Sequence, residues 1–174
     1  MKSGTAPAPD LVGSFSLSPN KSNFAAGEPV TIFVTVTNQG NATATPFWVD
    51  FYINPSPAPT TANLIWNNAC GMNPCFGLAW YVSGGLAPGQ SIVLTSQPGQ
   101  FATAYSRWYG WFASGSSDLY LYVDTWNPTV STGAVAESNE TNNRSERHGL
   151  VVTGINPAFR LSEPDTIPTR PAPR

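Results

Sequence analysis

The sequence predicts an all-β protein, an antiparallel β-sandwich of about seven short strands with two long loop excursions. Apolar and polar side chains alternate with a period of two in several segments, as in strands that bury one face, and helical spacing is nearly absent. The 15 glycines and 17 prolines recur along the whole chain, a pattern typical of turns between short strands. A chain of 174 residues predicts one domain with a sizeable core.

Three segments show the alternation most clearly. In residues 30–36, Val and Ile alternate with Thr and Phe. Residues 47–53 place Phe, Val and Ile on one face and two aromatic side chains with one Asp on the other, and residues 119–123 alternate Leu and Val with Tyr. Shorter strands are expected at residues 10–17, 78–82, 91–95 and 148–153.

Two long excursions interrupt this rhythm. The first, residues 55–76, contains both cysteines, and the second, residues 97–117, is rich in aromatic residues. Long irregular loops are uncommon in compact domains and are usually functional or disordered. Because disordered segments are poor in aromatic residues, these two are expected to be ordered.

The ends of the chain differ in composition from the predicted sandwich. Residues 1–9 are expected to form an N-terminal extension, and residues 10–154 the sandwich itself. Residues 155–174 have the Pro-rich composition of an extended spacer, which predicts a linker or tail.

The two cysteines, Cys70 and Cys75, flank an Asn-Pro turn signal that brings them within reach of each other. A zinc site would need four ligands, and the single histidine, His148, is the only other soft ligand in the sequence. A disulfide is therefore favoured, with free thiols as the alternative. A disulfide would indicate an oxidising compartment.

The charge of the chain excludes some classes of partner. Charged residues make up 10% of the sequence and the net charge is −2, so neither nucleic acid nor an anionic membrane surface is expected as a partner. The longest apolar run, residues 76–82, is far shorter than the about 20 residues of a membrane-spanning helix, so no membrane insertion is expected. No signal-peptide run precedes the first strand, and the signal of an exported protein would lie outside this chain.

Several short motifs follow one another in a specific order and spacing. They are Pro9-Asp10-Leu11-Val12, Ala26-Gly27-Glu28-Pro29-Val30, Val36-Thr37-Asn38-Gln39-Gly40, Phe47-Trp48-Val49-Asp50-Phe51-Tyr52, Leu86-Ala87-Pro88-Gly89-Gln90-Ser91 and Glu137-Ser138-Asn139-Glu140-Thr141-Asn142-Asn143. Together they resemble the CARDB domain, the "cell adhesion related domain found in bacteria". The resemblance covers residues 9–153.

The resemblance implies an immunoglobulin-like β-sandwich of bacterial or archaeal surface and secreted proteins, usually one module of a longer chain. It implies no enzymatic activity. The sequence departs from the compact family pattern in its two long excursions, so the binding behaviour of shorter relatives does not extend to them.

The residues themselves also argue against an enzyme. His148 is next to Arg147 at the start of an expected strand, and no nearby nucleophile marks a catalytic triad. The sequence contains no Walker, dinucleotide-binding or Gly-x-Ser-x-Gly motif.

Oxygen-bearing side chains gather after the predicted strand that leads to Asp124. Beyond a loop come Glu137, Asn139, Glu140, Asn142 and Asn143. Calcium takes about six to eight oxygen ligands, so these side chains could meet Asp124 in a calcium site. In the alternative interpretation, they cap the turn and bond backbone N–H groups. No other cofactor is expected.

The chain is rich in aromatic residues, with six Trp, six Tyr and nine Phe. Trp48 and Tyr52 lie on the strand face opposite the predicted core, so another part of the chain has to cover them. In one interpretation the excursions fold over the sandwich and bury their aromatic residues in a satellite core. In the other, some stay exposed as a platform for sugar rings or a protein partner. The candidate platform residues are Trp66, Trp108, Tyr109 and Trp111.

These observations favour a non-catalytic extracellular module that adheres, spaces or displays within a larger surface or secreted protein. The alternative is a carbohydrate-binding module that uses exposed aromatic residues of the excursions. The expected partner is a protein or a glycan at the cell surface.

Overall fold

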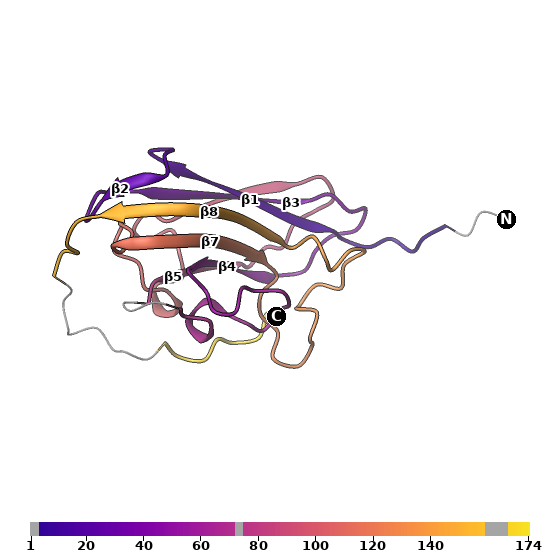
Figure 1. The fold of residues 1–174 in the computed structure, drawn as a ribbon. Coiled ribbons are helices and arrows are strands. Elements are labelled where there is room, and N and C mark those ends of the chain that lie inside the picture. The colour runs from indigo at the N-terminus through magenta and orange to yellow at the C-terminus, as the bar shows by residue number, and fades with distance from the viewer. Residues whose placement is uncertain (1–3, 72–74, 159–166) are drawn as a thin grey trace.

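The computed structural model describes residues 4–71, 75–158 and 167–174, which form a β-sandwich of two sheets (Figure 1). One sheet has the strand order β1-β3-β6, and the other has the order β2-β8-β7-β4-β5. The strands are β1 (Leu11–Ser18), β2 (Asn23–Ala25), β3 (Thr31–Asn38), β4 (Phe47–Ile53), β5 (Gly77–Val82), β6 (Ser91–Thr95), β7 (Gly115–Val123) and β8 (Arg144–Thr153). The predicted all-β fold class is confirmed.

The predicted strands are all present, with two differences in extent. Strands β7 and β8 both begin several residues earlier than predicted, and they pair with each other along most of their length. These additional residues are mostly polar or exposed, so they lack the alternation that marks a strand in the sequence. Strand β2 was not predicted, because its three residues are too short for a pattern, and it pairs in parallel with the end of β8.

The main core lies between the two sheets. It is formed by the apolar side chains that define the period-two pattern, and Val34, Phe51 and Leu121 have no exposed surface. Strand β1 crosses this core closely, because a Cβ atom on Gly13 would lie only 2.7 Å from a methyl carbon of Val123. The alternation in the sequence thus identifies the inner face of each sheet.

A second cluster lies on the opposite face of the five-stranded sheet. We call it the outer aromatic cluster; its buried members are Trp48, Tyr52, Trp66, Ala69, Ala79 and Tyr122. Strand β4 lies between β7 and β5 in this sheet, and all its residues are buried. Two short 3-10 helices in the excursions, η1 (Trp66–Asn68) and η2 (Thr103–Tyr105), help to cover this face.

The end of the chain also lies on this outer face, unlike the linker or tail that its composition predicts. Ile167 packs against the outer aromatic cluster, and the side chain of Arg170 is buried in an ion pair with Asp50. Proline-rich composition predicted an extended segment, but it carried no information about the surface that the segment contacts. No helix in the described part of the chain is long and apolar enough to cross a membrane.

Candidate functional site

The carboxylate of Asp124 is held by the loop that follows β7. Its Oδ1 accepts a hydrogen bond from the Ala134 N–H at 2.9 Å, and its Oδ2 accepts one from the Val135 N–H at 2.8 Å. The residue has no exposed surface, and burial raises the pKa of Asp124 to about 7, although the two N–H donors act in the opposite direction. Asp124 therefore fixes the conformation of the loop that follows β7 by accepting hydrogen bonds from its backbone.

Glu137 ties the next turn to the first strand of the other sheet. Its Oε2 accepts the Leu11 N–H at 2.5 Å, and its Oε1 accepts a hydrogen bond from Asn143 Nδ2 at 2.7 Å. Burial raises the pKa of Glu137 to about 8, and the charges of Asp124 and Glu140 contribute in the same direction. The structure thus brings these three predicted carboxylates into one electrostatic neighbourhood.

The remaining predicted oxygen donors serve the turn itself. The Glu140 carboxylate accepts the Glu137 N–H at 2.8 Å, and Asn139 Oδ1 accepts the Thr141 N–H at 3.0 Å. Asn142 donates from Nδ2 to Asp10 at 2.8 Å. These are the backbone and side-chain contacts that the turn-capping interpretation predicts.

Within the described residues, no group of three or more His, Cys, Asp or Glu side chains is arranged to hold a metal ion. The oxygens with spare capacity are amides, because Asn142 Oδ1 and Asn143 Oδ1 are buried and have no hydrogen-bond partner. A cation at this edge would have to use these oxygens together with carboxylates that already accept hydrogen bonds.

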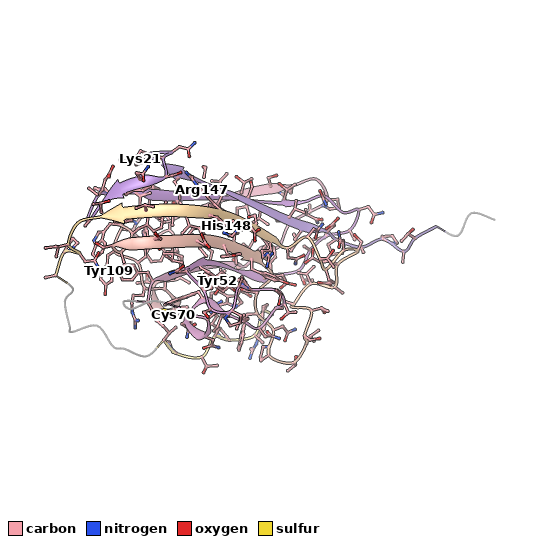
Figure 2. All side chains as sticks on the ribbon, in the orientation of Figure 1. Lys21, Tyr52, Cys70, Tyr109, Arg147 and His148 are labelled. Atoms are coloured by element: carbon pink, nitrogen blue, oxygen red, sulfur yellow. A yellow bond between two sulfur atoms is a disulfide. The ribbon has the colours of Figure 1, made fainter. Side chains whose placement is uncertain are left out.

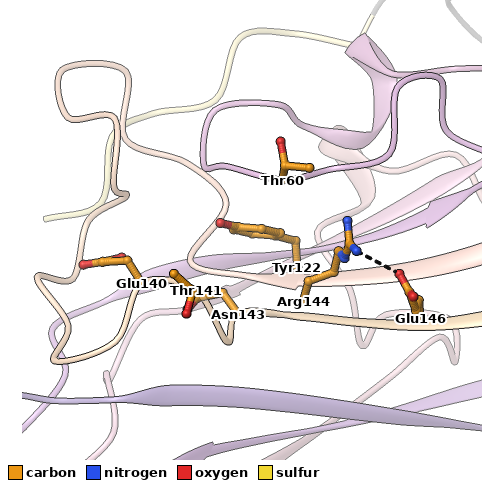
Figure 3. A pocket seen from close by; sticks show the side chains of 7 residues that line it. All are labelled: Thr60, Tyr122, Glu140, Thr141, Asn143, Arg144 and Glu146. Atoms are coloured by element: carbon orange, nitrogen blue, oxygen red, sulfur yellow. Dashed lines mark ion pairs between the residues drawn. The ribbon is translucent and has the colours of Figure 1, made fainter.

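An open polar pocket of about 480 Å³ adjoins the same turn (Figure 3). Its floor includes Tyr122 of β7, and Arg144 at the start of β8 forms an ion pair with Glu146 at 3.2 Å. Arg144 also donates to the Pro59 carbonyl at 3.2 Å, which joins the first excursion to β8. The full lining is Thr60, Tyr122, Glu140, Thr141, Asn143, Arg144 and Glu146.

The predicted aromatic platform is divided between two places. Trp66 is 2% exposed and donates from its indole to the Tyr105 carbonyl at 2.8 Å, so its inclusion in an exposed platform is wrong. The reason is that Gly77 of β5 has no side chain and lets the indole lie directly on the sheet. Trp66 instead belongs to the outer aromatic cluster, as the satellite-core interpretation predicts.

The aromatic residues of the second excursion pack mainly against the main core and not in a satellite core. Trp108 and Phe112 meet edge to face with ring centroids 5.3 Å apart, and Tyr109 and Trp111 stack at 5.9 Å. All three platform candidates are partly buried against that core. Figure 2 shows Tyr109 at one end of the sandwich, and its ring meets that of Phe76 edge to face with centroids 5.2 Å apart.

The predicted disulfide between Cys70 and Cys75 is present, with a Cα–Cα distance of 5.8 Å. It closes the first excursion beside the outer aromatic cluster, and both cysteines contact that cluster. His148 is exposed between two carboxylates, with Asp118 Oδ2 at 3.1 Å and Glu146 Oε1 at 3.3 Å. This surface ion-pair group contains no nucleophile.

Sequence reasoning missed the most deeply buried charged group of the outer face, the ion pair of Asp50 and Arg170. A signal was present, because Asp50 interrupts an aromatic strand face between Trp48 and Tyr52, and a buried carboxylate requires a cation. The sequence did not identify which basic residue supplies it, since Arg170 is far away in the chain.

The two packed sheets define an immunoglobulin-like β-sandwich. A CARDB family model matches residues 8–147, so the chain belongs to the CARDB family. CARDB is a family of non-enzymatic domains and suggests an adhesion-related module.

Two solved structures of one archaeal domain resemble this fold. The crystal structure of the CARDB domain of the PF1109 protein from Pyrococcus furiosus, in complex with di-metal ions, is 21% identical with a TM-score of 0.53. That alignment covers 87% of this chain and 100% of that chain. The solution NMR structure of the same domain is 19% identical, with a TM-score of 0.50 over 84% of this chain and 97% of that chain. No curated protein matches the chain.

Proposed function

We propose that the chain is a non-catalytic extracellular module that adheres, spaces or displays within a larger bacterial surface or secreted protein. The family match over residues 8–147 is the observation that carries this proposal. The disulfide between Cys70 and Cys75 supports an oxidising compartment. The partner we propose is a protein or glycan at the cell surface.

Protease treatment of intact cells that produce the parent protein tests the location. The module should be digested while a cytoplasmic marker stays intact, because an exposed surface protein is within reach of the protease. Adhesion is tested by coating beads with the oxidised chain and counting bound cells against beads coated with the heat-unfolded chain. Digestion only after lysis, or equal binding to both beads, contradicts the proposal.

Carbohydrate binding is the alternative, and it rests on the partly buried aromatic residues of the second excursion. Stacked Tyr109 and Trp111 are the pair best suited to contact a sugar ring. A glycan array followed by tryptophan-fluorescence titration tests this role. A saturable ligand that is lost in Trp111→Ala and kept in Tyr81→Ala would favour it over a purely adhesive or spacing module.

Calcium binding is a second proposal, at Asp124 and the turn of residues 137–143, together called the acidic turn. It is supported by the unpartnered oxygens of Asn142 and Asn143. The similar archaeal domain holds di-metal ions. A cation would raise the melting temperature by binding only the folded state, and Glu140→Gln should remove the rise while Glu146→Gln keeps it. Identical melting curves in millimolar calcium and in excess chelator would leave turn capping as the role of these side chains.

A further inference from the structure

The C-terminal segment, residues 167–174, lies on the outer face of the five-stranded sheet. Figure 1 shows it on the side of that sheet away from β1 and β3. The segment forms no strand of either sheet, and it lies beyond the residues that the family model matches. Its position therefore depends on side-chain contacts and not on a shared hydrogen-bonded ladder.

Asp50 is the anchor of this surface. Its side chain has no exposed surface, yet it belongs to the outer face of β4 together with Trp48 and Tyr52. Thr125 Oγ1 donates to its Oδ1 at 2.9 Å, and the Trp66 N–H donates to its Oδ2 at 2.9 Å. These donors orient the carboxylate but leave its negative charge without a cation.

Arg170 supplies that cation with the geometry of specific recognition. Its Nη2 donates to Asp50 Oδ2 at 2.7 Å while its Nη1 contacts Oδ1, a bidentate pair. The guanidinium also lies over the ring of Trp48, 5.1 Å from the centroid. A lysine could neither form both parallel hydrogen bonds nor stack in this way.

Side chains of the sandwich also bind the backbone of the segment. Trp48 Nε1 donates to the Pro171 carbonyl at 3.2 Å, and Trp126 Nε1 donates to the Arg170 carbonyl at 3.2 Å. Indole donors that contact successive peptide carbonyls, beside an aromatic surface, are typical of domains that bind proline-rich peptides. The prolines of the segment keep it extended before it binds, which lowers the entropy lost on docking.

We propose that this outer face is a peptide-binding site for an extended arginine–proline segment, and that residues 167–174 of the same chain are its ligand. The site would take the same segment from a second copy of the chain, because every contact described above is non-covalent. The module would then bind its own C-terminal segment non-covalently. Two copies of the chain could be linked by exchanging these C-terminal segments.

A cleavable form of the full chain tests the proposal. A protease site inserted after Ala158 allows the C-terminal fragment to be cut from the folded protein and followed by size-exclusion chromatography. The fragment should elute with the sandwich at high protein concentration and separate on dilution. It should also exchange with a labelled synthetic peptide of residues 167–174 added from solution.

Peptide variants identify the recognised side chain without any risk to folding. An Arg170→Ala peptide should bind more than about 30-fold more weakly, because it leaves Asp50 buried without its cation. An Arg170→Lys peptide should also bind more weakly than the native peptide, since it loses the bidentate pair. Thr169→Ala is the matched control and should bind unchanged, because Thr169 is exposed.

Three outcomes would overturn the proposal. If the fragment separates at every concentration and no peptide binds while circular dichroism shows a folded sandwich, the contact depends on the covalent connection. If the sandwich unfolds as soon as the fragment leaves, the segment is part of the fold and not a ligand. Equal binding of the Arg170→Ala and native peptides would show that Asp50 is not the anchor.

Discussion

The two faces of the five-stranded sheet are built on different principles. The inner face packs apolar side chains of β4 and β7 against the other sheet, and those residues come from regular period-two strands. The outer face carries large aromatic side chains and one buried carboxylate, and it is covered by loops and by the end of the chain. The inner face is therefore stabilised mainly by apolar burial, whereas the outer face also needs a buried charge to be paired.

Adjacent residues of β4 give the largest contrast between these faces. Phe51→Ala should lower the free energy of unfolding by about 3–5 kcal/mol, because it leaves a cavity in the main core. Tyr52→Phe on the outer face keeps the ring and removes only the hydroxyl that donates to the Leu64 carbonyl, so the loss should be about 1 kcal/mol. Chemical denaturation of both variants measures the difference. Equal losses would contradict the assignment of the main core to the inner face.

Removing the cation of the outer face should have the next largest effect. Arg170→Ala should lower the free energy of unfolding by about 2–3 kcal/mol, below the full cost of an unpaired buried charge, because the segment can leave and expose Asp50 to water. Arg174→Ala is the control, since its side chain is exposed and the change should stay within about 0.5 kcal/mol. If both variants unfold at the same denaturant concentration as the native chain, the ion pair does not stabilise the outer layer.

The disulfide of the outer layer should contribute less than the main core. On the chain-entropy model, closing so short a loop stabilises the protein by about 2 kcal/mol, so Cys70→Ser with Cys75→Ser should lose roughly that amount. Intact mass after alkylation without reductant checks the bond itself, and the native chain should gain no alkyl group. Two added groups would show free thiols and remove this support for an oxidising compartment.

The difference between the faces also explains how much the sequence could predict. The inner face follows from local alternation, so the strands around Val34, Phe51 and Leu121 were predictable from sequence alone. The acidic turn was predictable as a group of residues, but whether Glu137 caps a backbone N–H or holds a cation depends on tertiary geometry. The segments that cover Trp48 are far from it in the chain, and the period-two pattern of a strand carries no information about such contacts.

The acidic turn should make the stability of the protein fall as the pH rises from about 5 to about 8. Burial raises the pKa of Asp124 to about 7 and that of Glu137 to about 8, so the folded state binds these protons more tightly than the unfolded state. The two protonated carboxyl groups contribute their full stabilisation below the ordinary carboxyl pKa. This contribution is lost as the pH rises past the raised pKa values of the folded state. The hydrogen bond with Asp118 raises the pKa of exposed His148. The stabilising contribution of its protonated ring is therefore also lost as the pH rises above the ordinary histidine pKa.

Melting temperatures measured in chelator across this pH range test the expectation without interference from calcium. Asp124→Asn combined with Glu137→Gln should flatten the decline, because the amides cannot ionise, and the variant should lose about 1–3 kcal/mol at pH 5 through poorer pairing with the surrounding N–H groups. His148→Gln is the control that removes only the surface contribution. A native stability that rises towards pH 8 would mean that the N–H donors outweigh burial and that both carboxylates are ionised in the folded chain.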